Sequence, residues 1–367
     1  MTVMMVEPPK PNDSDATPPG RWIAGLSAGM PLLEALEIIF RQRYEGVLYY
    51  LPLAARRADE NIEYVHKLRV ACRRLGAVLE VLAEGFSEAP RQSVLEQLEK
   101  VRRVCGRARD LDVRRMFLEC ILRLASVDDA AVVELLCEQT VVKRERAQKD
   151  VRRRLEKLEG GLRDAGNELL SSLRSAKREA AAAILFGNTG ARILSRELAA
   201  LWELADKDLD SPATLHQLRI ACKHLRYAFE VFIPVLDVSF RDDFYPQLEA
   251  VQKLLGEVHD ADEAKRAFRR ARKKWKSWKG TRKWTRRGLG GFRWRELRAG
   301  LDAVLLAYAQ EADHARTEFL DLWPGFSGES FRRPVATLLA AAGAPQSSVI
   351  PEPGQGDMRA NEHLLPN

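Results

Sequence analysis

The sequence predicts an all-α protein built from internally duplicated helical bundles. Apolar residues recur at helical spacing along most of the 367 residues, and no stretch combines strand alternation with turn dipeptides. Part of the chain is also repeated: HKLRVACRRLGAVLEVL from His66 and HQLRIACKHLRYAFEVF from His216 are identical at eight of 17 positions. QLEKVRRVCGRARDLDV from Gln97 and QLEAVQKLLGEVHDADE from Gln247 agree at seven of 17, again 150 residues apart. Repeated order at a fixed separation indicates an internal duplication.

The helices can be predicted in order along the chain. The first begins at Leu32, because the fixed φ of Pro31 suits a first helical turn. Further helices are expected at about 61–82 and 90–112, then from Asp112, then from Asp128 to Glu159 with an end at Gly160–Gly161. The second half repeats the order more loosely, with helices expected near 162–178, 191–207, 213–233, 240–257, 259–274 and 299–322.

These elements divide the chain into four parts. Residues 1–24 are expected to be a disordered leader and residues 25–160 the first bundle. Residues 161–325 form the second bundle, which includes a basic, Trp-rich segment at 265–298. Residues 326–367 are expected to be a mostly disordered tail, because Pro, Gly and polar residues dominate its second half.

Charge and cysteine usage limit the function. The net charge is +7, yet segment 265–298 holds 16 Lys and Arg residues against one carboxylate, Glu296, so the rest of the chain is net acidic. A localised positive field favours a polyanionic partner. No stretch approaches the roughly 18 apolar residues of a membrane span, and the N-terminus lacks the order of a signal peptide. The five cysteines lie in apolar helical patterns without a C-x-x-C pair, so we expect buried, reduced thiols and a cytoplasmic location.

The repeated helix has an apolar face and an adjoining basic face. The predicted buried positions are Val65, Leu68, Cys72, Leu75, Leu79 and Leu82 in the first copy and Leu215, Leu218, Cys222, Leu225, Phe229 and Phe232 in the second. Beside each stripe, basic residues recur one turn apart, which costs a helix a few tenths of a kcal/mol per pair. The basic face is either a solvated face neutralised by acids of adjacent helices or a row of donors for successive phosphates.

These motifs resemble one known family. H-x-x-R-V-x-x-R-R-L with G-x-x-R-D-x-D-V, and L-H-x-L-R-I-x-x-K-x-L-R-Y with L-G-x-x-H-D, are similar to the CHAD (conserved histidine α-helical domain) family over about residues 27–325. The resemblance implies two helical bundles related by pseudo-two-fold symmetry. It also implies binding of inorganic polyphosphate through basic residues around a central channel, with polyphosphate granules as one place of action.

The resemblance implies a set of ligand-binding residues. They are His66, Arg69, Arg73 and Arg103 in the first copy and His216, Arg219, Lys223, Arg226 and Lys253 in the second, with Arg103 and Lys253 as secondary positions. Gly76 stands in the first copy where the second has Arg226, so we expect the two halves to contribute unequally. The chain lacks the alternating glutamates of the triphosphate-tunnel enzyme domain that adjoins many relatives. We therefore expect a stand-alone, non-catalytic binding protein without cofactor or metal, and the sequence does not indicate its oligomeric state.

Two other functions remain open. Asp110 with Asp112, or Asp260 with Asp262, would serve a metal-dependent phosphohydrolase only if the helix breaks there, since residues two apart point about 200° from each other. Otherwise these aspartates would begin the next helix or pair with arginines. The four tryptophans of segment 265–298 would suit single-stranded nucleic acid if bases stack on them, or would anchor the segment to the bundle.

Overall fold

The protein is all-α in a computed structural model that describes residues 20–124, 127–179, 184–205, 207–286 and 289–343. Within these ranges the only β pairing is an isolated bridge between Pro31 and Leu185. The α-helices are α1 Leu32–Arg56, α2 Glu63–Val81, α3 Glu88–Leu124, α4 Val127–Glu179, α5 Phe186–Ala205, α6 Pro212–Phe232, α7 Tyr245–Trp278, α8 Arg282–Arg286, α9 Trp294–Ser327 and α10 Glu329–Gly343.

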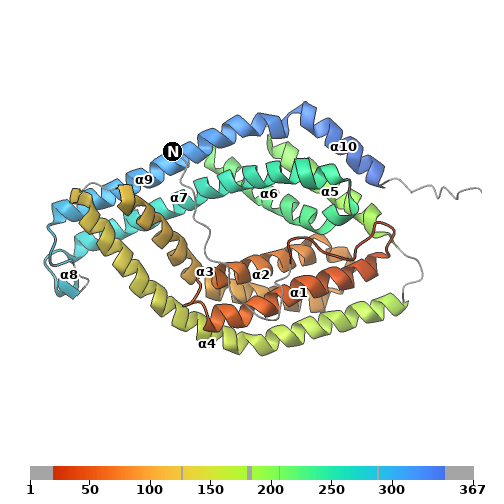
Figure 1. The fold of residues 1–367 in the computed structure, drawn as a ribbon, viewed down its shortest axis with the longest axis horizontal. Helices are drawn as coiled ribbons and strands as arrows, with labels where there is room; N and C mark the ends of the chain where they lie inside the picture. The colour runs from red at the N-terminus through yellow and green to blue at the C-terminus, as the bar shows by residue number, and fades with distance from the viewer. Residues whose placement is uncertain (1–19, 125–126, 180–183, 206, 287–288, 344–367) are drawn as a thin grey trace, which may run out of the picture.

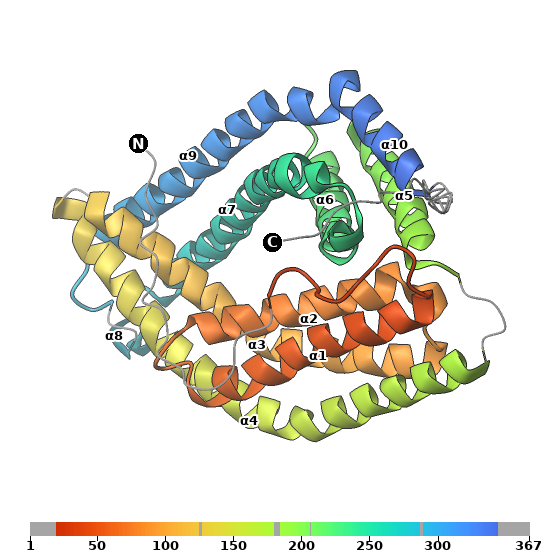
Figure 2. The same cartoon turned by 45° about the vertical axis from the view of Figure 1, so that its right-hand side comes forward.

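Two groups of helices face each other (Figure 1). α1 to α4 lie on one side, and α5, α6, α7, α9 and α10 lie on the other, as both views show (Figures 1 and 2). α2 contacts α6, so the two copies of the repeated helix are direct neighbours in space. α3 packs on α2 and α7 packs on α6, which places the second repeated segment of each half beside the first. The pseudo-two-fold relation between the halves stays a prediction from the repeat.

The predicted apolar stripes of α2 and α6 form the centre of the core. None of their twelve positions is more than 8% exposed, and ten of them are fully buried. Burial of a large apolar side chain contributes about 1.5–3 kcal/mol, whereas like charges one turn apart cost only tenths. The stripes therefore stabilise two helices whose adjoining faces are crowded with positive charge.

A second apolar cluster lies where α3 ends, α4 begins, and α7 and α9 approach them. Leu118 from α3, Val133 from α4, Trp275 from α7 and Leu297 from α9 are each at most 4% exposed. In Figure 2 this is the end of the molecule that carries α8. The cluster thus joins the two groups of helices at one end, away from the contact of α2 with α6.

The expected helix breaks near the aspartates are wrong. α3 runs without interruption from Glu88 to Leu124, and α7 from Tyr245 to Trp278, so no new helix begins at Asp112 and 240–257 is not separate from 259–274. Ala108 and Leu111 continue the buried face of α3 across the expected break. Burial along one face therefore outweighs the weak breaking tendency of Gly106 and Gly256.

The expected end of a helix at Gly160–Gly161 is also wrong. α4 continues to Glu179, and the boundary drawn between residues 160 and 161 falls inside it. Leu155, Leu162 and Leu169 keep the apolar stripe in register through the glycines, and all three are fully buried. Their burial offsets the cost of about 1 kcal/mol that each interior glycine adds.

Both expected tails include ordered segments. Ile23, within the leader predicted for residues 1–24, is 2% exposed and belongs to the core; residues 1–19 lie outside the described residues. At the other end, Phe326 and Leu339 are buried and 329–343 forms α10, so the tail predicted for 326–367 is wrong over that part. Residues 344–367 lie outside the described residues. The sequence missed α10 because Pro334 and a run of small residues weaken its apolar pattern.

The continuity of α4 makes a specific stability prediction at Gly160. This glycine is exposed inside the helix, and a Cβ atom built on it meets nothing within 4 Å. Gly160→Ala should raise the free energy of unfolding by about 0.5–1 kcal/mol, because alanine loses less backbone entropy in a helix. Chemical denaturation followed by circular dichroism measures it.

Gly166→Ala in the same helix is the matched control, since its Cβ would lie 2.3 Å from the Tyr44 ring and should destabilise the protein. Destabilisation by Gly160→Ala would instead mean that α4 ends at Gly160 in a conformation that alanine does not tolerate.

Candidate functional site

Cationic side chains from three helices meet where α2, α3 and α6 face one another. α2 contributes Arg73, α3 contributes Arg102, and α6 contributes Arg219 and Lys223. We call these four residues the central basic cluster. The helical repeat explains this placement for Arg73 and Lys223. Each directly follows a buried cysteine of the apolar stripe, Cys72 or Cys222, so its side chain lies on the adjoining face of the helix.

The pKa of Lys223 shows how strongly these charges act on one another. Burial lowers it below its usual value, and the positive charges of Arg102, Arg73 and Arg219 lower it further. Glu80 acts in the opposite direction and is the weakest of the influences. Among the described residues, no member of the cluster forms an ion pair, and the Nε atoms of Arg73 and Arg219 are buried without a hydrogen-bond partner. The cluster is therefore not neutralised from within.

His66 and Arg69 extend the basic surface along α2. Burial and then the charges of Arg109, Arg73 and Arg69 lower the pKa of His66 to about 4, so its imidazole is neutral at pH 7. Arg69 donates from Nη1 to the carbonyl oxygen of Arg102 at 2.6 Å, which fixes it against α3. Burial also lowers the pKa of the Arg69 guanidinium.

His216 begins the corresponding surface on α6. Its ring lies 5.4 Å from the ring of His259 on α7, measured between centroids. Burial lowers the pKa of His259, and the charge of Arg219 lowers it further. Burial raises the pKa of Asp110 on α3, Arg69 opposes that rise, and the charge of Asp260 on α7 adds to it. The basic surface thus runs from the histidines at one end to the central basic cluster.

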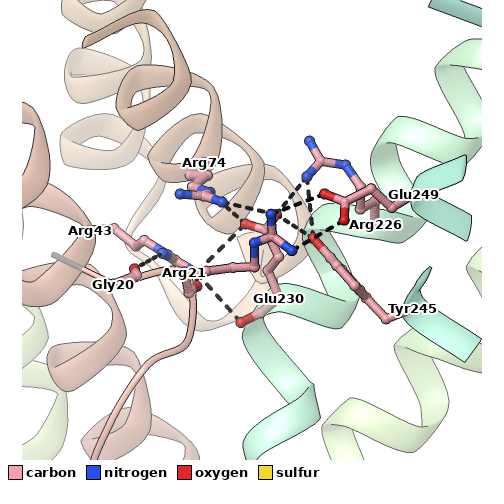
Figure 3. Close-up of polar contacts among 8 residues, drawn as sticks. All are labelled: Gly20, Arg21, Arg43, Arg74, Arg226, Glu230, Tyr245 and Glu249. Atoms are coloured by element: carbon pink, nitrogen blue, oxygen red, sulfur yellow. Dashed lines mark hydrogen bonds and ion pairs between the residues drawn. The ribbon is translucent and has the colours of Figure 1, made fainter. Parts of the chain in front are cut away.

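Arg226 belongs to a different cluster, which is built around a buried carboxylate. It donates from Nη1 to Glu230 Oε1 at 2.7 Å, and Glu230 is 1% exposed. The same carboxylate accepts two hydrogen bonds from Arg74 of α2, at 2.6 and 3.3 Å, and one from the Tyr245 hydroxyl at 2.9 Å. Arg43 of α1 lies 3.8 Å away. Figure 3 shows these side chains converging on Glu230 from four helices, and we call them the Glu230 cluster.

The Glu230 cluster holds the two groups of helices together at their centre. Burial alone would lower the pKa of Arg226, but the charge of Glu230 together with Tyr227 and the hydrogen-bonded Tyr245 more than offsets burial, and the pKa is raised. Burial lowers the pKa of Arg43 to about 10 despite the same carboxylate. Arg226, predicted as a ligand-binding residue, thus has a carboxylate partner, whereas Lys223 one turn away has none among the described residues.

Arg103 and Lys253, the secondary predictions, point into solvent. Each side chain is 72% exposed and pairs with a glutamate one turn away on its own helix. Arg103 pairs with Glu99, and Lys253 pairs with Glu257. The structure therefore does not bring them to the central basic cluster. Arg102, the neighbour of Arg103, lies there instead.

The pairing of Arg226 with Glu230 could be anticipated from the sequence, whereas the position of Arg102 could not. Glu80 and Glu230 occupy equivalent repeat positions, and only the second copy has an arginine one turn earlier, since Gly76 replaces it in the first. Glu80 is exposed and Glu230 is buried, which agrees with that difference. Arg102 had no such signal, because Gln252 stands at its equivalent and repetition alone does not select it.

The aspartate pairs do not form the metal sites that we considered. Asp112 is 1% exposed and pairs with the buried Arg144 of α4, which is an arginine outside the basic surface. Asp262 forms an ion pair with Lys265 at 2.7 Å. Because α3 and α7 are unbroken, Asp110 and Asp112 lie on different faces of α3, and Asp260 and Asp262 lie on different faces of α7. In the part of the chain that the structure describes, no group of three or more His, Cys, Asp or Glu could hold a metal ion.

The tryptophans of segment 265–298 pack inward. Trp275 is 4% exposed, and Trp278, Trp284 and Trp294 pack against the same apolar cluster between α3, α4, α7 and α9. The rings of Trp284 and Trp294 lie 6.5 Å apart. This arrangement favours the anchoring interpretation, because all four rings contact the apolar cluster; Trp275 is buried and the other three are half-buried.

Comparison with known proteins identifies the family. The CHAD domain family profile matches residues 38–269, which is more than half of the chain. This chain belongs to the CHAD domain family. The match ends within α7, so most of segment 265–298 lies beyond it. A search of curated proteins found no match to the sequence.

Two solved structures resemble this CHAD protein. The crystal structure of the CHAD domain from the plant Ricinus communis has a TM-score of 0.62 at 19% identity and covers 83% of this chain and 97% of its own. PptA from Streptomyces chartreusis has a TM-score of 0.56, also at 19% identity, over 80% of this chain and 99% of its own. At this identity the likeness shows the fold.

Two further features of the CHAD protein bear on expectations from the sequence. All five cysteines are free; Cys72, Cys105 and Cys222 are buried and burial raises their pKa, whereas Cys120 and Cys137 are only partly buried. Over the described residues, no helix is both long and apolar enough to cross a membrane.

The Glu230 cluster predicts a large effect of one neutralising substitution. Glu230→Gln should lower the free energy of unfolding by about 3–5 kcal/mol, because it leaves three guanidiniums with an uncompensated charge in the interior. Urea denaturation of the variant and the wild type measures the difference.

Glu249→Gln is the matched control, since Glu249 forms an ion pair with Arg21 in which both side chains are 42% exposed. An exposed pair contributes below about 1 kcal/mol. Equal, small losses in the two variants would show that Glu230 does not hold the halves together.

Proposed function

We propose that this CHAD protein binds inorganic polyphosphate, without catalysis, along the surface from His66 and His216 to the central basic cluster. The observation that carries the proposal is the absence of ion pairs, among the described residues, at Arg73, Arg102, Arg219 and Lys223. Membership of the CHAD family supports it, because that family is associated with polyphosphate binding.

The unpaired cations of the central basic cluster need a negative charge from outside the protein. The three arginines around the partly buried Lys223 lower its pKa, and this repulsion raises the free energy of the unliganded protein. A linear anion with one charge per phosphate group would offset that cost at successive positions. Each charge-assisted hydrogen bond to phosphate contributes about 1.5–3 kcal/mol when water is excluded. The row of donors therefore suits a polymer of phosphates better than a single small acid.

Segment 265–298 would act as an auxiliary surface in this function. Its tryptophans face the apolar cluster, and basic residues such as Lys273, Lys276 and Lys279 are exposed. An exposed positive field raises the rate of association with a polyanion and is screened by salt. We propose that it captures polyphosphate, including chains at a granule surface, before the central surface binds them.

Substitution of the central basic cluster tests the proposal. Arg219→Glu combined with Lys223→Glu should abolish polyphosphate binding, because it replaces two attractive charges with two repulsive ones. Helicity and melting temperature should stay close to those of the wild type, since neither residue has a structural ion pair among the described residues. Equilibrium titration with polyphosphate at fixed ionic strength measures the affinity.

The matched control removes the same number of positive charges from solvent-facing positions. Arg103→Glu combined with Lys253→Glu should weaken binding by less than about tenfold, because both side chains are 72% exposed and already paired. Equal losses in the two double variants would mean that net charge alone, and not the central surface, determines binding.

Single-stranded RNA at equal phosphate concentration distinguishes the nucleic-acid function. Polyphosphate should compete RNA off the protein, and RNA should change tryptophan fluorescence little, because all four rings of the segment contact the apolar cluster. Preference for RNA with quenched tryptophan fluorescence would support the nucleic-acid function instead. Phosphate release that requires a divalent metal and Asp110 would support the hydrolase.

Proton uptake is expected on binding. The pKa of free His66 is about 4, against about 6.5 for an unperturbed histidine, so between these values the free protein leaves it neutral. A bound polyanion would raise that pKa by supplying negative charge, so affinity should increase as the pH falls from about 7 to about 5. Calorimetric titration in buffers of different ionisation enthalpy counts the protons.

His66→Gln should reduce the proton uptake and the pH dependence without abolishing binding, because His259, whose pKa is also lowered, still titrates. The same pH dependence in wild type and His66→Gln would show that the ligand does not reach His66.

A further inference from the structure

The groove between α1 and α2 contains a cavity that the proposed chain-binding surface does not use. Its volume is about 270 Å³, and its cationic walls come from Arg43 of α1 and from Lys67 and Arg74 of α2. One water molecule needs a cavity of only ~10–15 Å³, so this cavity has room for a phosphate-sized anion and several waters. His66 lies between this cavity and the central basic cluster, since it lines the first and its pKa responds to Arg73 and Arg69.

The charges around the cavity do not balance. Arg43, Arg74 and Arg226 share the single carboxylate of Glu230. That carboxylate already accepts hydrogen bonds from Arg74, Arg226 and Tyr245, so it has little remaining capacity for Arg43. The neighbouring acid Glu249 is paired with Arg21. Three buried or half-buried guanidiniums thus face one negative charge.

Several donors at the cavity have no acceptor among the described residues. Arg43, only 6% exposed, donates to the carbonyl oxygens of Gly20 and Arg21, and its buried Nε has no partner, so it contributes charge and no accessible donor. Arg74 uses Nε and Nη2 on Glu230, which leaves Nη1. The ammonium of Lys67 lies 5.9 Å from the Tyr50 ring centroid and has no ion pair in the described part of the chain. No lining residue that the structure describes is a carboxylate.

We propose that this cavity binds one tetrahedral oxyanion, a free phosphate or the end group of a polyphosphate chain. The anion accepts hydrogen bonds from Lys67 and Arg74 and offsets the surplus charge of the Glu230 cluster. Surplus charge, unused donors and sufficient volume coincide here, on the opposite side of His66 from the central basic cluster. The site goes beyond chain binding, because it does not require the cations of that cluster.

Inorganic phosphate is the probe for the free ion, measured by calorimetric titration of the full chain. Lys67→Gln should weaken phosphate binding by about tenfold or more, the loss expected for one charge-assisted hydrogen bond. Ala71→Leu should abolish it, because Ala71 lines the cavity and the larger side chain fills it. Lys100→Gln is the control, since this exposed lysine of α3 does not line the cavity, and it should leave phosphate binding unchanged.

Tripolyphosphate distinguishes the end group of a chain from the free ion. If it binds more tightly than phosphate and loses affinity with Lys67→Gln, the cavity accepts a chain end. If phosphate alone responds to Lys67→Gln, the cavity accepts the free ion. Circular dichroism and melting temperature establish that Lys67→Gln and Ala71→Leu are folded.

Two results would overturn the site. The first is no phosphate binding by the wild type, and the second is phosphate binding that Lys67→Gln and Ala71→Leu leave unchanged. Arg219→Glu with Lys223→Glu separates this site from the proposed function, because it should leave phosphate binding at the cavity intact. Loss of phosphate binding in that variant would place the anion on the central basic cluster instead.

Discussion

One buried carboxylate, that of Glu230, separates the structural cations of this protein from the cations that are left for a ligand. Arg74 and Arg226 reach it from α2 and α6 and form hydrogen bonds to it, so their charges help to hold the two groups of helices together. Lys223 lies one helical turn from Arg226 and has no such partner among the described residues. The same repeated helix therefore supplies both a paired contact and an unpaired basic surface, and the position of a single glutamate decides which arginines and lysines belong to each.

Apolar burial offsets the free-energy cost of leaving part of the basic surface without partners. The stripes of α2 and α6 are almost completely buried, and their contribution is an order of magnitude larger than the repulsion between charges one turn apart. Helical geometry then places the basic residues on the face adjoining each stripe. Because α2 and α6 contact each other, both basic faces border the same region, and α3 adds Arg102 to it. A linear polyanion matches this surface because its charges repeat along its length, as those of the helices do.

The sequence predicted the fold class, the buried stripes and the family, because helical periodicity and a repeated motif are local signals. Helix ends were harder to predict. Gly106 and Gly160 weaken a helix locally, but apolar residues on both sides pack against other helices and keep it continuous. The site was predicted in part: Arg73, Arg219 and Lys223 lie together, whereas Arg226 and Arg103 pair with glutamates one turn away on their own helices, which the spacing allows but does not require. Arg102 was missed because its repeat equivalent is Gln252, and its role depends on which face of α3 packs on α2 beside α6.

A crystal structure of the protein with a polyphosphate of medium chain length tests the central claim most directly. The account predicts phosphate density within hydrogen-bond distance of Arg73, Arg102, Arg219 and Lys223, with Arg226 still bonded to Glu230. Density confined to the exposed lysines between residues 273 and 283, with the central basic cluster empty, would contradict it.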